Sequence, residues 1–269
     1  MIVLRNGPAE LHLDPAAGGR VAQLLVDGLP VLARVHGTAV HWGSFVMAPW
    51  AGRIRRGRFT FAGTTYDLPT DRMPPHAIHG TVLDRPWTVV PASTDTSAEL
   101  ECALGDSWPW RGRVRQRVSL EGDGATFRIE VHTVDAPFPA SAGWHPWFHR
   151  RLADGGPVQI TLDAAAMLPR DADGIPTGLR APVRRGPWDD CFVDVRWPIV
   201  LHWPGALRLE VGGDTRYAVV YDLLDDAVCV EPQTGPPDAL TLEPLVVTPE
   251  APLVTTMTWT WIRHGRGGR

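Results

Sequence analysis

The sequence contains no lysine, so all 26 of its Lys or Arg residues are arginine. A Schiff base, whether with a sugar aldehyde or with pyridoxal phosphate, requires a lysine amine, and both routes are closed to this chain acting alone. Motifs for nucleotide cofactors are also missing, because no Gly-x-Gly-x-x-Gly follows a predicted strand and no Walker loop occurs. We therefore expect chemistry that needs no cofactor.

Cysteine is scarce as well. Cys102, Cys191 and Cys229 form no Cys-x-x-Cys pair, and an odd number fits a reducing compartment better than a disulfide framework. Residues 1–5 lead into polar sequence without the apolar core of a signal peptide, and no run of about 18 apolar residues offers a membrane span. The sequence predicts a cytoplasmic protein with no membrane partner.

An excess of positive charge is absent too. The net charge of −4 gives no general attraction to nucleic acid, so we expect no nucleic-acid partner. One local basic segment, 53–58, carries four arginines. By itself this segment is typical of a strand edge whose alternate side chains face water.

Helix is expected to be scarce, since Gly (27) and Pro (26) leave few windows in which an apolar helical period could extend over three turns. Strand alternation is clearer. Residues 114–120 and 125–132 predict two half-buried strands joined by a Gly-containing turn at 121–124. Further strands are predicted at 58–68, with a turn at 62–64, and at 207–211, 217–221, 227–230 and 257–262.

The chain shows no repeat with a period of about 20–50 residues and no Ser-rich or charged linker. The sequence therefore predicts an all-β fold, a large antiparallel β-sandwich with little helix. One domain is expected over residues 1–264, followed by a flexible tail at 265–269.

Three short segments place titratable residues among aromatic residues, Gly and Pro, where a strand would ordinarily carry apolar residues: 77–80, 143–148 and 229–234. In the second segment, Pro146 disfavours the α conformation for His145 and holds it extended. The aromatic neighbours predict a partly dry pocket, in which the pKa of an imidazole can be tuned near neutrality. A structural histidine bonded to a backbone carbonyl is the alternative.

In the third segment, Glu231 follows the apolar run 227–230 and precedes Pro232, which indicates a position at the end of a buried strand. A buried carboxylate is costly to desolvate unless it is paired or used. Burial also raises its pKa toward the range of a useful general base. A salt bridge to one of the arginines is the competing interpretation.

Two histidine pairs are spaced like metal ligands, His76 with His79 and His145 with His149. Neither pair has the helical context, carboxylate or further ligand of a complete site, so we predict no metal. Most of the 12 tryptophans are expected to fill the core, whereas those in polar segments are candidates for stacking on a sugar: Trp42, Trp50, Trp144 and Trp147.

Five motifs, in this order, resemble the aldose 1-epimerase (galactose mutarotase) family, whose pieces are Asn-Arg, His-Gly, His-Pro-Tyr-Phe, Asp-x-x-Phe, and a Glu followed by Gln and Pro-Asp-Ala. Here they read Gly52-Arg53, His79-Gly80, His145-Pro146-Trp147-Phe148, Asp189-Asp190-Cys191-Phe192, and Glu231-Pro232-Gln233 with Pro237-Asp238-Ala239 behind it. Gly52 replaces the family's Asn and Trp147 its Tyr, which leaves the identity of the substrate open.

The resemblance implies a β-sandwich of the galactose mutarotase type that binds a small-molecule sugar without a cofactor. It implies that Glu231 takes the proton of the anomeric hydroxyl while His145 protonates the ring oxygen. The ring then opens, and rotation about C1–C2 followed by reclosure gives the other anomer. It further implies a set of residues that hold the sugar or steady the base: Arg53, His79, Asp189, Trp147 and Gln233.

Other assignments remain open. The substrate is a free aldose or a hexose 6-phosphate, whose phosphate Arg53 and Arg72 could bind. Asp189 with Glu231 would instead form the carboxylate pair of a glycoside hydrolase or lyase. A non-catalytic carbohydrate-binding module would keep the fold and the tryptophans. The assembly is expected to be a monomer or a homodimer.

Overall fold

The hairpin predicted within 114–132 is present as β12 (Gly112–Glu121) and β13 (Gly124–Thr133), which pair in register on both sides of a two-residue turn. Along each strand, buried residues alternate with more exposed ones, as a half-buried sheet requires. The computed structural model describes residues 1–35, 38–91, 93–153 and 155–263, so the predicted tail at 265–269 lies outside the described residues.

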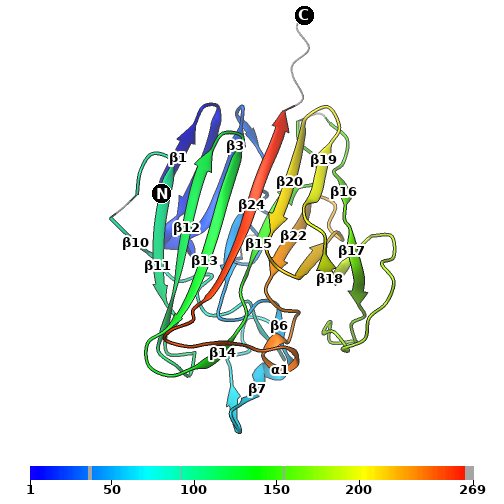
Figure 1. Cartoon of the computed structure of the whole chain (residues 1–269). Coiled ribbons are helices and arrows are strands. Elements are labelled where there is room, and N and C mark those ends of the chain that lie inside the picture. The colour runs from blue at the N-terminus through cyan, green and yellow to red at the C-terminus, as the bar shows by residue number, and fades with distance from the viewer. Residues whose placement is uncertain (36–37, 92, 154, 264–269) are drawn as a thin grey trace, which may run out of the picture.

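This hairpin belongs to an antiparallel sheet that forms one layer of the molecule (Figure 1). Its order within the described residues is β10-β11-β12-β13-β24-β20-β19-β16. The remaining strands are β10 (Thr88–Val89), β11 (Ser97–Ala103), β16 (Gln159–Thr161), β19 (Ile199–Trp203), β20 (Leu207–Gly213) and β24 (Leu253–Arg263).

A second antiparallel sheet forms the other layer, and it brings together strands that are far apart in the sequence. Its order is β1-β2-β3-β5-β15-β22-β21-β18-β17, with β4 paired to β3. These strands are β1 (Ile2–Asn6), β2 (Ala9–Asp14), β3 (Arg20–Val26), β4 (Leu29–Pro30), β5 (Ser44–Met47), β15 (Gly143–His149), β17 (Ala164–Leu168), β18 (Asp189–Val195), β21 (Tyr217–Tyr221) and β22 (Ala227–Gln233).

The main hydrophobic core lies between the two sheets. In β22, Val228 and Val230 belong to this core, whereas Cys229 and Glu231 alternate with them and face the other side of the sheet. The same alternation in β15 directs Trp144 into the core and His145 away from it. The second sheet is therefore buried on both faces at its centre, and its outer face carries polar groups.

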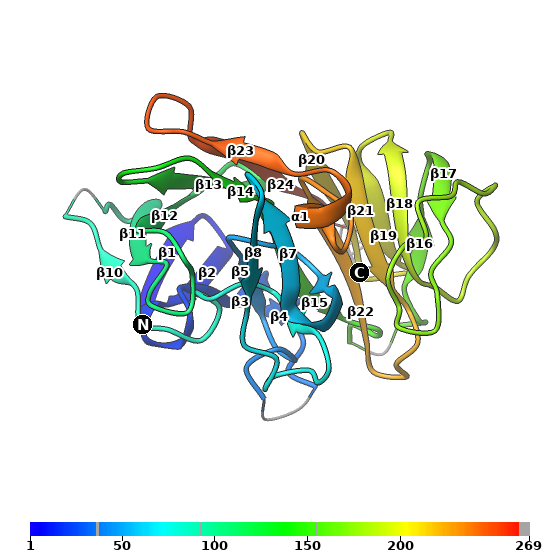
Figure 2. The same ribbon diagram turned by 90° about the horizontal axis from the view of Figure 1, so that it is seen from below.

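Short elements collect at the lower end of the sandwich in Figure 1, the end that is nearest the viewer in Figure 2. They include β6 (Arg53–Ile54), β7 (Arg58–Phe61), β8 (Thr64–Asp67), β9 (Ala77–Ile78), β14 (Phe138–Ala140), β23 (Leu245–Val247), the helix α1 (Ala239–Leu242), and the 3-10 turn η2 (Arg55–Gly57); a second 3-10 turn, η1 (Pro15–Ala17), follows β2.

The predicted fold class is confirmed: the described residues form mainly antiparallel strands and very little helix. The strands predicted at 58–68, 207–211, 217–221, 227–230 and 257–262 all correspond to observed strands. In the part of the chain that the structure describes, no helix combines the length and the apolar character needed to cross a membrane.

Candidate active site

A cavity of about 480 Å³ lies on the outer face of the second sheet, and side chains from β15, β18, β21 and β22 line it together with surrounding turns. The seven residues that the sequence singled out as site residues all line this cavity: Arg53, His79, His145, Trp147, Asp189, Glu231 and Gln233. Their roles stay predictions, but residues from five separate motifs meet in one place.

The centre of the site is the boundary between β15 and β22. Their assigned pairs are Gly143 with Gln233 and Trp147 with Cys229, so His145 stands opposite Glu231 between them. Its Nε2 lies 3.3 Å from the Glu231 Oε1. Pro146 and Pro232 beside this position have no N–H to donate to the ladder. The sheet therefore places an imidazole and a carboxylate where its backbone pairing is interrupted.

The position of Glu231 differs from the sequence prediction. The strand was expected to end near this residue, but β22 continues through Pro232 to Gln233. Pairing with β21 carries it past the proline, since Ala218 still aligns with Pro232. Glu231 is consequently held within a central strand, at 3% exposure, rather than at a strand end.

Burial raises the pKa of Glu231 well above its usual value, and the nearby Asp189 carboxylate raises it further. Gln233, two residues on and on the same face, donates from Nε2 to the Glu231 Oε2 over 3.1 Å. This bond fixes one carboxylate oxygen and leaves the other toward His145. The structure thus gives Gln233 the contact that the predicted steadying role requires.

The His145 ring lies between aromatic groups. It stacks on Phe45 with 4.8 Å between centroids and on Trp147 with 5.2 Å, and the edge of His79 meets it at 5.0 Å. Burial in this setting lowers the pKa of His145 to about 3. The predicted extended conformation is present, but the dry pocket moves the pKa further from neutrality than expected.

His79 reaches the cavity through an unusual backbone. Its φ is +59°, in the left-handed region, and its N–H donates to the Gly52 carbonyl over 3.0 Å. Gly80 follows at φ +76°, and a Cβ there would lie 1.9 Å from the Ala48 carbonyl oxygen. The His-Gly pair is therefore a steric requirement: glycine permits the close approach that turns the imidazole into the cavity.

Arg53 lies in β6, where it pairs with Ile78 of β9, and its side chain lines the cavity. Its Nη1 donates to the Gly174 carbonyl over 3.1 Å. The segment 53–58 is not the continuous strand edge that its charge pattern indicated, because η2 interrupts it after Ile54.

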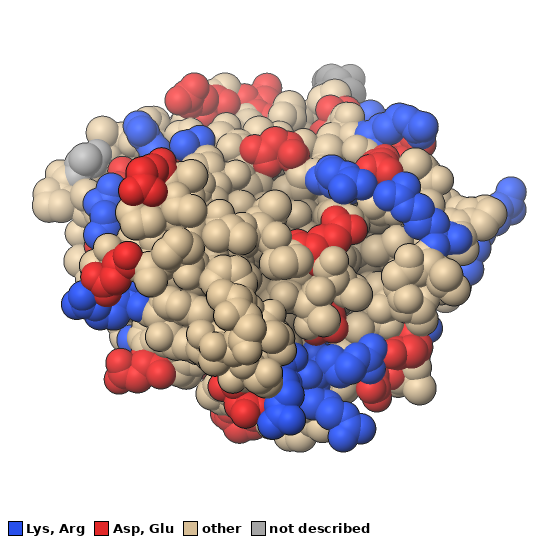
Figure 3. Space-filling view, turned by 60° about the horizontal axis from the view of Figure 1, so that its bottom comes forward, with Lys and Arg blue, Asp and Glu red and all other residues tan. Residues whose placement is uncertain are grey.

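Two of the other arginines of this segment are paired with acidic groups. Arg55 contacts Asp171 and Asp173, and Arg58 contacts Asp67. On the face shown in Figure 3, basic side chains likewise lie next to acidic ones instead of forming one broad basic surface. The local charge of the segment is thereby partly neutralised.

Asp189 and Asp190 begin β18 and both line the cavity, but they have different partners. Asp189 is ion-paired with Arg170, and Asp190 is ion-paired with Arg184 over 2.6 Å. Asp189 is the more exposed of the two carboxylates, with 23% of its side chain accessible compared with 6% for Asp190. A ligand in the cavity therefore has a carboxylate available at Asp189.

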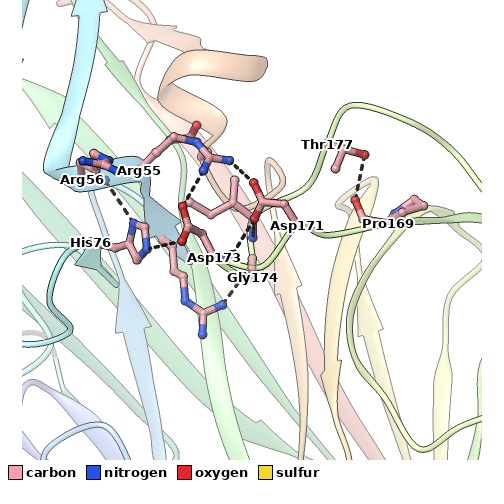
Figure 4. Close-up of polar contacts among 11 residues, drawn as sticks. Arg55, Arg56, His76, Pro169, Asp171, Asp173, Gly174 and Thr177 are labelled. Atoms are coloured by element: carbon pink, nitrogen blue, oxygen red, sulfur yellow. Dashed lines mark hydrogen bonds and ion pairs between the residues drawn. The ribbon is translucent and has the colours of Figure 1, made fainter.

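One wall of the cavity is the turn that follows β17 and carries Gly174 and Pro176. Figure 4 shows how contacts with the η2 region hold it: Arg55 donates to Asp171 over 2.6 Å and to Asp173 over 2.9 Å. His76 lies 3.8 Å from Asp173 and accepts the Arg56 backbone N–H over 3.1 Å. The arginine-rich segment thus shapes the cavity indirectly.

Of the four tryptophans considered for sugar stacking, only Trp147 lines the cavity. Its indole N–H donates to the Val40 carbonyl over 2.8 Å, which fixes the ring. Trp50 and Trp144 belong to the core, and Trp42 packs under the Arg20 guanidinium instead. Burial therefore contradicts the stacking hypothesis for Trp50 and Trp144, and Trp42 lies outside this cavity, whereas stacking stays a prediction for Trp147.

The two histidine pairs do not form metal sites with each other in the described parts of the chain. His145 instead groups with Cys229 and Glu231, with one ligand atom of each within 4.8 Å of the others. This group, rather than either histidine pair, has the donor set of a metal site.

Sequence reasoning missed several cavity residues. Tyr221 and Val219 face the cavity because they occupy alternate positions of β21, and Leu168 and Arg170 reach it from the end of β17. The alternation of 217–221 predicted a strand, but only the neighbouring strands show which of its faces lines the cavity. Arg170 carried no signal, since its partner Asp189 lies in another strand and only the fold brings them together.

Comparison with known proteins connects this geometry to a family. The sequence model described as "Aldose 1-epimerase" matches residues 2–239. Mouse galactose mutarotase is 29% identical over 158 residues, which are 56% of this chain and 44% of that protein. The uncharacterized protein YphB of Escherichia coli K12 is 29% identical over 151 residues, 54% of this chain and 50% of its own. The chain spans about half the length of these curated relatives.

Solved structures share the fold over nearly the whole chain. The GalM/aldose epimerase homologue from C. elegans superposes with a TM-score of 0.82 at 17% identity, covering 98% of this chain and 99% of that one. Galactose 1-epimerase from Lactobacillus acidophilus gives 0.81 at 17% identity, covering 98% and 94%. Since the family model spans most of the sequence and the fold agrees, the chain belongs to the aldose 1-epimerase family.

Proposed function

We propose that this protein is an aldose 1-epimerase that interconverts the α and β anomers of a hexose. The observation that carries the proposal is the 3.3 Å contact between His145 and Glu231, which are both buried and both line the cavity. Ring opening requires that one oxygen lose a proton and that its neighbour gain one. A carboxylate and an imidazole at this separation can serve the two oxygens.

In the proposed reaction, Glu231 takes the proton of the anomeric hydroxyl as His145 donates a proton to the ring oxygen. The C1–O5 bond breaks and the sugar becomes an open-chain aldehyde. After rotation about C1–C2, the two transfers run in reverse and close the ring on the other face. The protons return to their starting residues, so the cycle consumes no co-reactant.

Burial favours the forward proton transfers. It raises the pKa of Glu231 and lowers that of His145, so the protonated carboxyl and the neutral imidazole are the preferred forms in this dry site. These are the forms that ring opening produces. Ring opening therefore starts from the minor form of the pair, ionised Glu231 with protonated His145, and in that form Glu231 is a stronger base and His145 a stronger acid than either is in water.

The remaining cavity residues supply groups that bind a sugar. Arg53 and His79 offer donors near the acid–base pair, Asp189 offers acceptors at the cavity wall, and the fixed Trp147 ring offers an apolar face. Gly52 and Trp147 lack the amide and phenol found in the family pattern, so the set of hydroxyls that this site recognises is expected to differ.

Polarimetry of freshly dissolved α-glucose and α-galactose tests the proposal. The protein is expected to accelerate mutarotation above the spontaneous rate, and Glu231→Gln is expected to remove most of the acceleration while sugar binding remains. Full activity in Glu231→Gln would show that Glu231 is not the base. No acceleration with any aldose, but release of reducing sugar from an oligosaccharide, would support hydrolysis by Asp189 and Glu231 instead.

A second candidate substrate is a hexose 6-phosphate. Among the described residues, Arg53 has a carbonyl partner but no carboxylate, whereas Arg72 and Arg170 are paired with Asp84 and Asp189. An unpaired guanidinium at the cavity wall favours an anionic substituent. Comparison of kcat/KM for glucose and glucose 6-phosphate distinguishes the two substrates.

The proposal includes a cytoplasmic location. Cys102, Cys191 and Cys229 are all buried free thiols, which supports a reducing compartment. Detection of the protein in the cytoplasmic fraction of its host tests this point.

A further inference from the structure

Cys229 is a buried thiol that the proposed reaction does not use. It lies two residues before Glu231 in β22, on the same face of the sheet, and it pairs with Trp147 of β15. Its side chain is fully buried and forms no disulfide. The register thus puts a soft sulfur ligand directly beside the acid–base pair.

The three side chains approach the geometry of a metal site. One ligand atom from each of His145, Cys229 and Glu231 lies within 4.8 Å of the others. Zinc binds nitrogen and oxygen at about 2.0 Å and sulfur at about 2.3 Å, so tetrahedral neighbours stand roughly 3.3–3.6 Å apart. The His145 Nε2 to Glu231 Oε1 distance of 3.3 Å already fits, and the thiol needs to approach by about 1 Å.

The donor set selects the kind of ion. Nitrogen, sulfur and one oxygen suit Zn²⁺, whereas Mg²⁺ and Ca²⁺ require mostly oxygen ligands. Three protein ligands leave a fourth tetrahedral position. His145 and Glu231 both line the cavity, so that position is open to water or to a sugar oxygen.

We propose that His145, Cys229 and Glu231 form an inhibitory site for Zn²⁺. A bound ion occupies the imidazole nitrogen and the carboxylate oxygen that exchange protons with the sugar, so metal binding and mutarotation exclude each other. The ion is a regulator and not a resident cofactor. Inhibition rests on the proposed function, whereas metal binding by these three ligands does not.

Direct binding is tested with Co²⁺ and Cd²⁺, whose thiolate complexes absorb light by charge transfer. The metal-free protein is titrated and compared with Cys229→Ser, Cys229→Ala and, as a matched control, Cys102→Ser, which changes a buried thiol in β11 of the other sheet. A charge-transfer band is expected in the unmodified protein and in Cys102→Ser. It should vanish in both Cys229 variants, with affinity at least tenfold weaker.

No band in the unmodified protein, which requires no variant to fold, would overturn the site. A band that persists in a folded Cys229 variant would overturn the ligand assignment. Circular dichroism identifies which of the two Cys229 variants is folded.

Inhibition is tested by polarimetry in increasing Zn²⁺, with each variant compared to its own metal-free rate. Mutarotation is expected to fall with Zn²⁺ and to recover with a chelator, and the Cys229 variants should need at least tenfold more Zn²⁺. Binding without any mutarotation in metal-free protein would contradict the proposed function and leave the site intact. Mutarotation that stays unchanged at Zn²⁺ concentrations that displace Co²⁺ from the site, as loss of the Co²⁺ charge-transfer band reports, would overturn the inhibitory role.

Discussion

His145 Nε2 lies 3.3 Å from Glu231 Oε1. The two residues face each other across the boundary between β15 and β22, and each is followed directly by a proline. The contact is closer than a sugar oxygen between them would allow, so a bound substrate must contact both groups side by side or separate them slightly. In either arrangement the two residues serve adjacent oxygens of one molecule. They are therefore expected to act as a unit.

The first prediction concerns this coupling. Glu231→Gln and His145→Asn should each lower kcat by about 10²–10⁴-fold, the usual contribution of one acid or base. The kcat of the double variant should be no more than about tenfold below that of the less active single variant, because neither proton transfer opens the ring without the other. Polarimetry of the three proteins measures this. A double variant whose loss equals the product of the single losses would indicate independent roles.

The second prediction concerns stability. The folded-state pKa of Glu231 is raised. Below the unfolded pKa of about 4.5 the carboxyl is protonated in both states and does not lower the free energy of unfolding. As pH rises above that value, the unfolded state loses its proton first and the free energy of unfolding falls. Glu231→Gln removes this cost, and the new amide oxygen can still accept the Gln233 bond. The variant should be more stable by roughly 1 kcal/mol or more at pH 8, with a smaller gain at pH 5.

Thermal or urea unfolding at both pH values checks the second prediction. Glu243→Gln is a suitable control, since this carboxylate is half-exposed and pairs with Tyr217 outside the cavity. An equal gain for Glu231→Gln at pH 5 and pH 8 would mean that charge is not the cause.

The sequence predicted much of this arrangement for physical reasons. Alternation along 114–132 has a single reading as a hairpin, and Pro146 restricts His145 to an extended conformation without help from the rest of the chain. These are local constraints. The family resemblance then connected motifs that local reasoning could not, because it placed 79, 145 and 231 in one cleft.

What could not be predicted depends on pairing between distant strands. β5, β15 and β22 are neighbours in the sheet although long stretches of chain separate them, and nothing local in the sequence encodes that order. β22 continues beyond Glu231 because β21 pairs with it there. The Arg170–Asp189 pair and the ligand group around Cys229 likewise follow from the assembled sheet.

The third prediction concerns Asp189. If it holds a sugar hydroxyl, Asp189→Asn should raise KM by about tenfold, with a smaller effect on kcat, since one charged hydrogen bond contributes roughly 1.5–3 kcal/mol. Arg170→Met should also raise KM, because the Asp189 carboxylate loses the ion pair that orients it. Arg180→Met, which breaks a pair with Asp194 outside the cavity, is the control. A change in kcat alone would argue for a chemical role of Asp189.

The fourth prediction compares two glycines with positive φ. Gly63 has φ +80°, and a Cβ added there would have no atom within 4 Å, whereas at Gly80 a Cβ would meet the Ala48 oxygen at 1.9 Å. Gly63→Ala should cost about 1–2 kcal/mol of unfolding free energy, from backbone strain alone. Gly80→Ala should cost about 3 kcal/mol or more and reduce kcat by displacing His79. Equal costs in urea unfolding would contradict the steric argument.

The fifth prediction concerns the cavity wall shown in Figure 4. Arg55→Met removes the contacts with Asp171 and Asp173, which are partly exposed and should contribute little to the unfolding free energy. The turn that carries Gly174 should nevertheless loosen, and we expect KM to rise several-fold while kcat changes little. Arg58→Met, which breaks only the exposed pair with Asp67, should alter neither KM nor kcat. If both variants raise KM equally, general loss of positive charge and not the position of the wall is responsible.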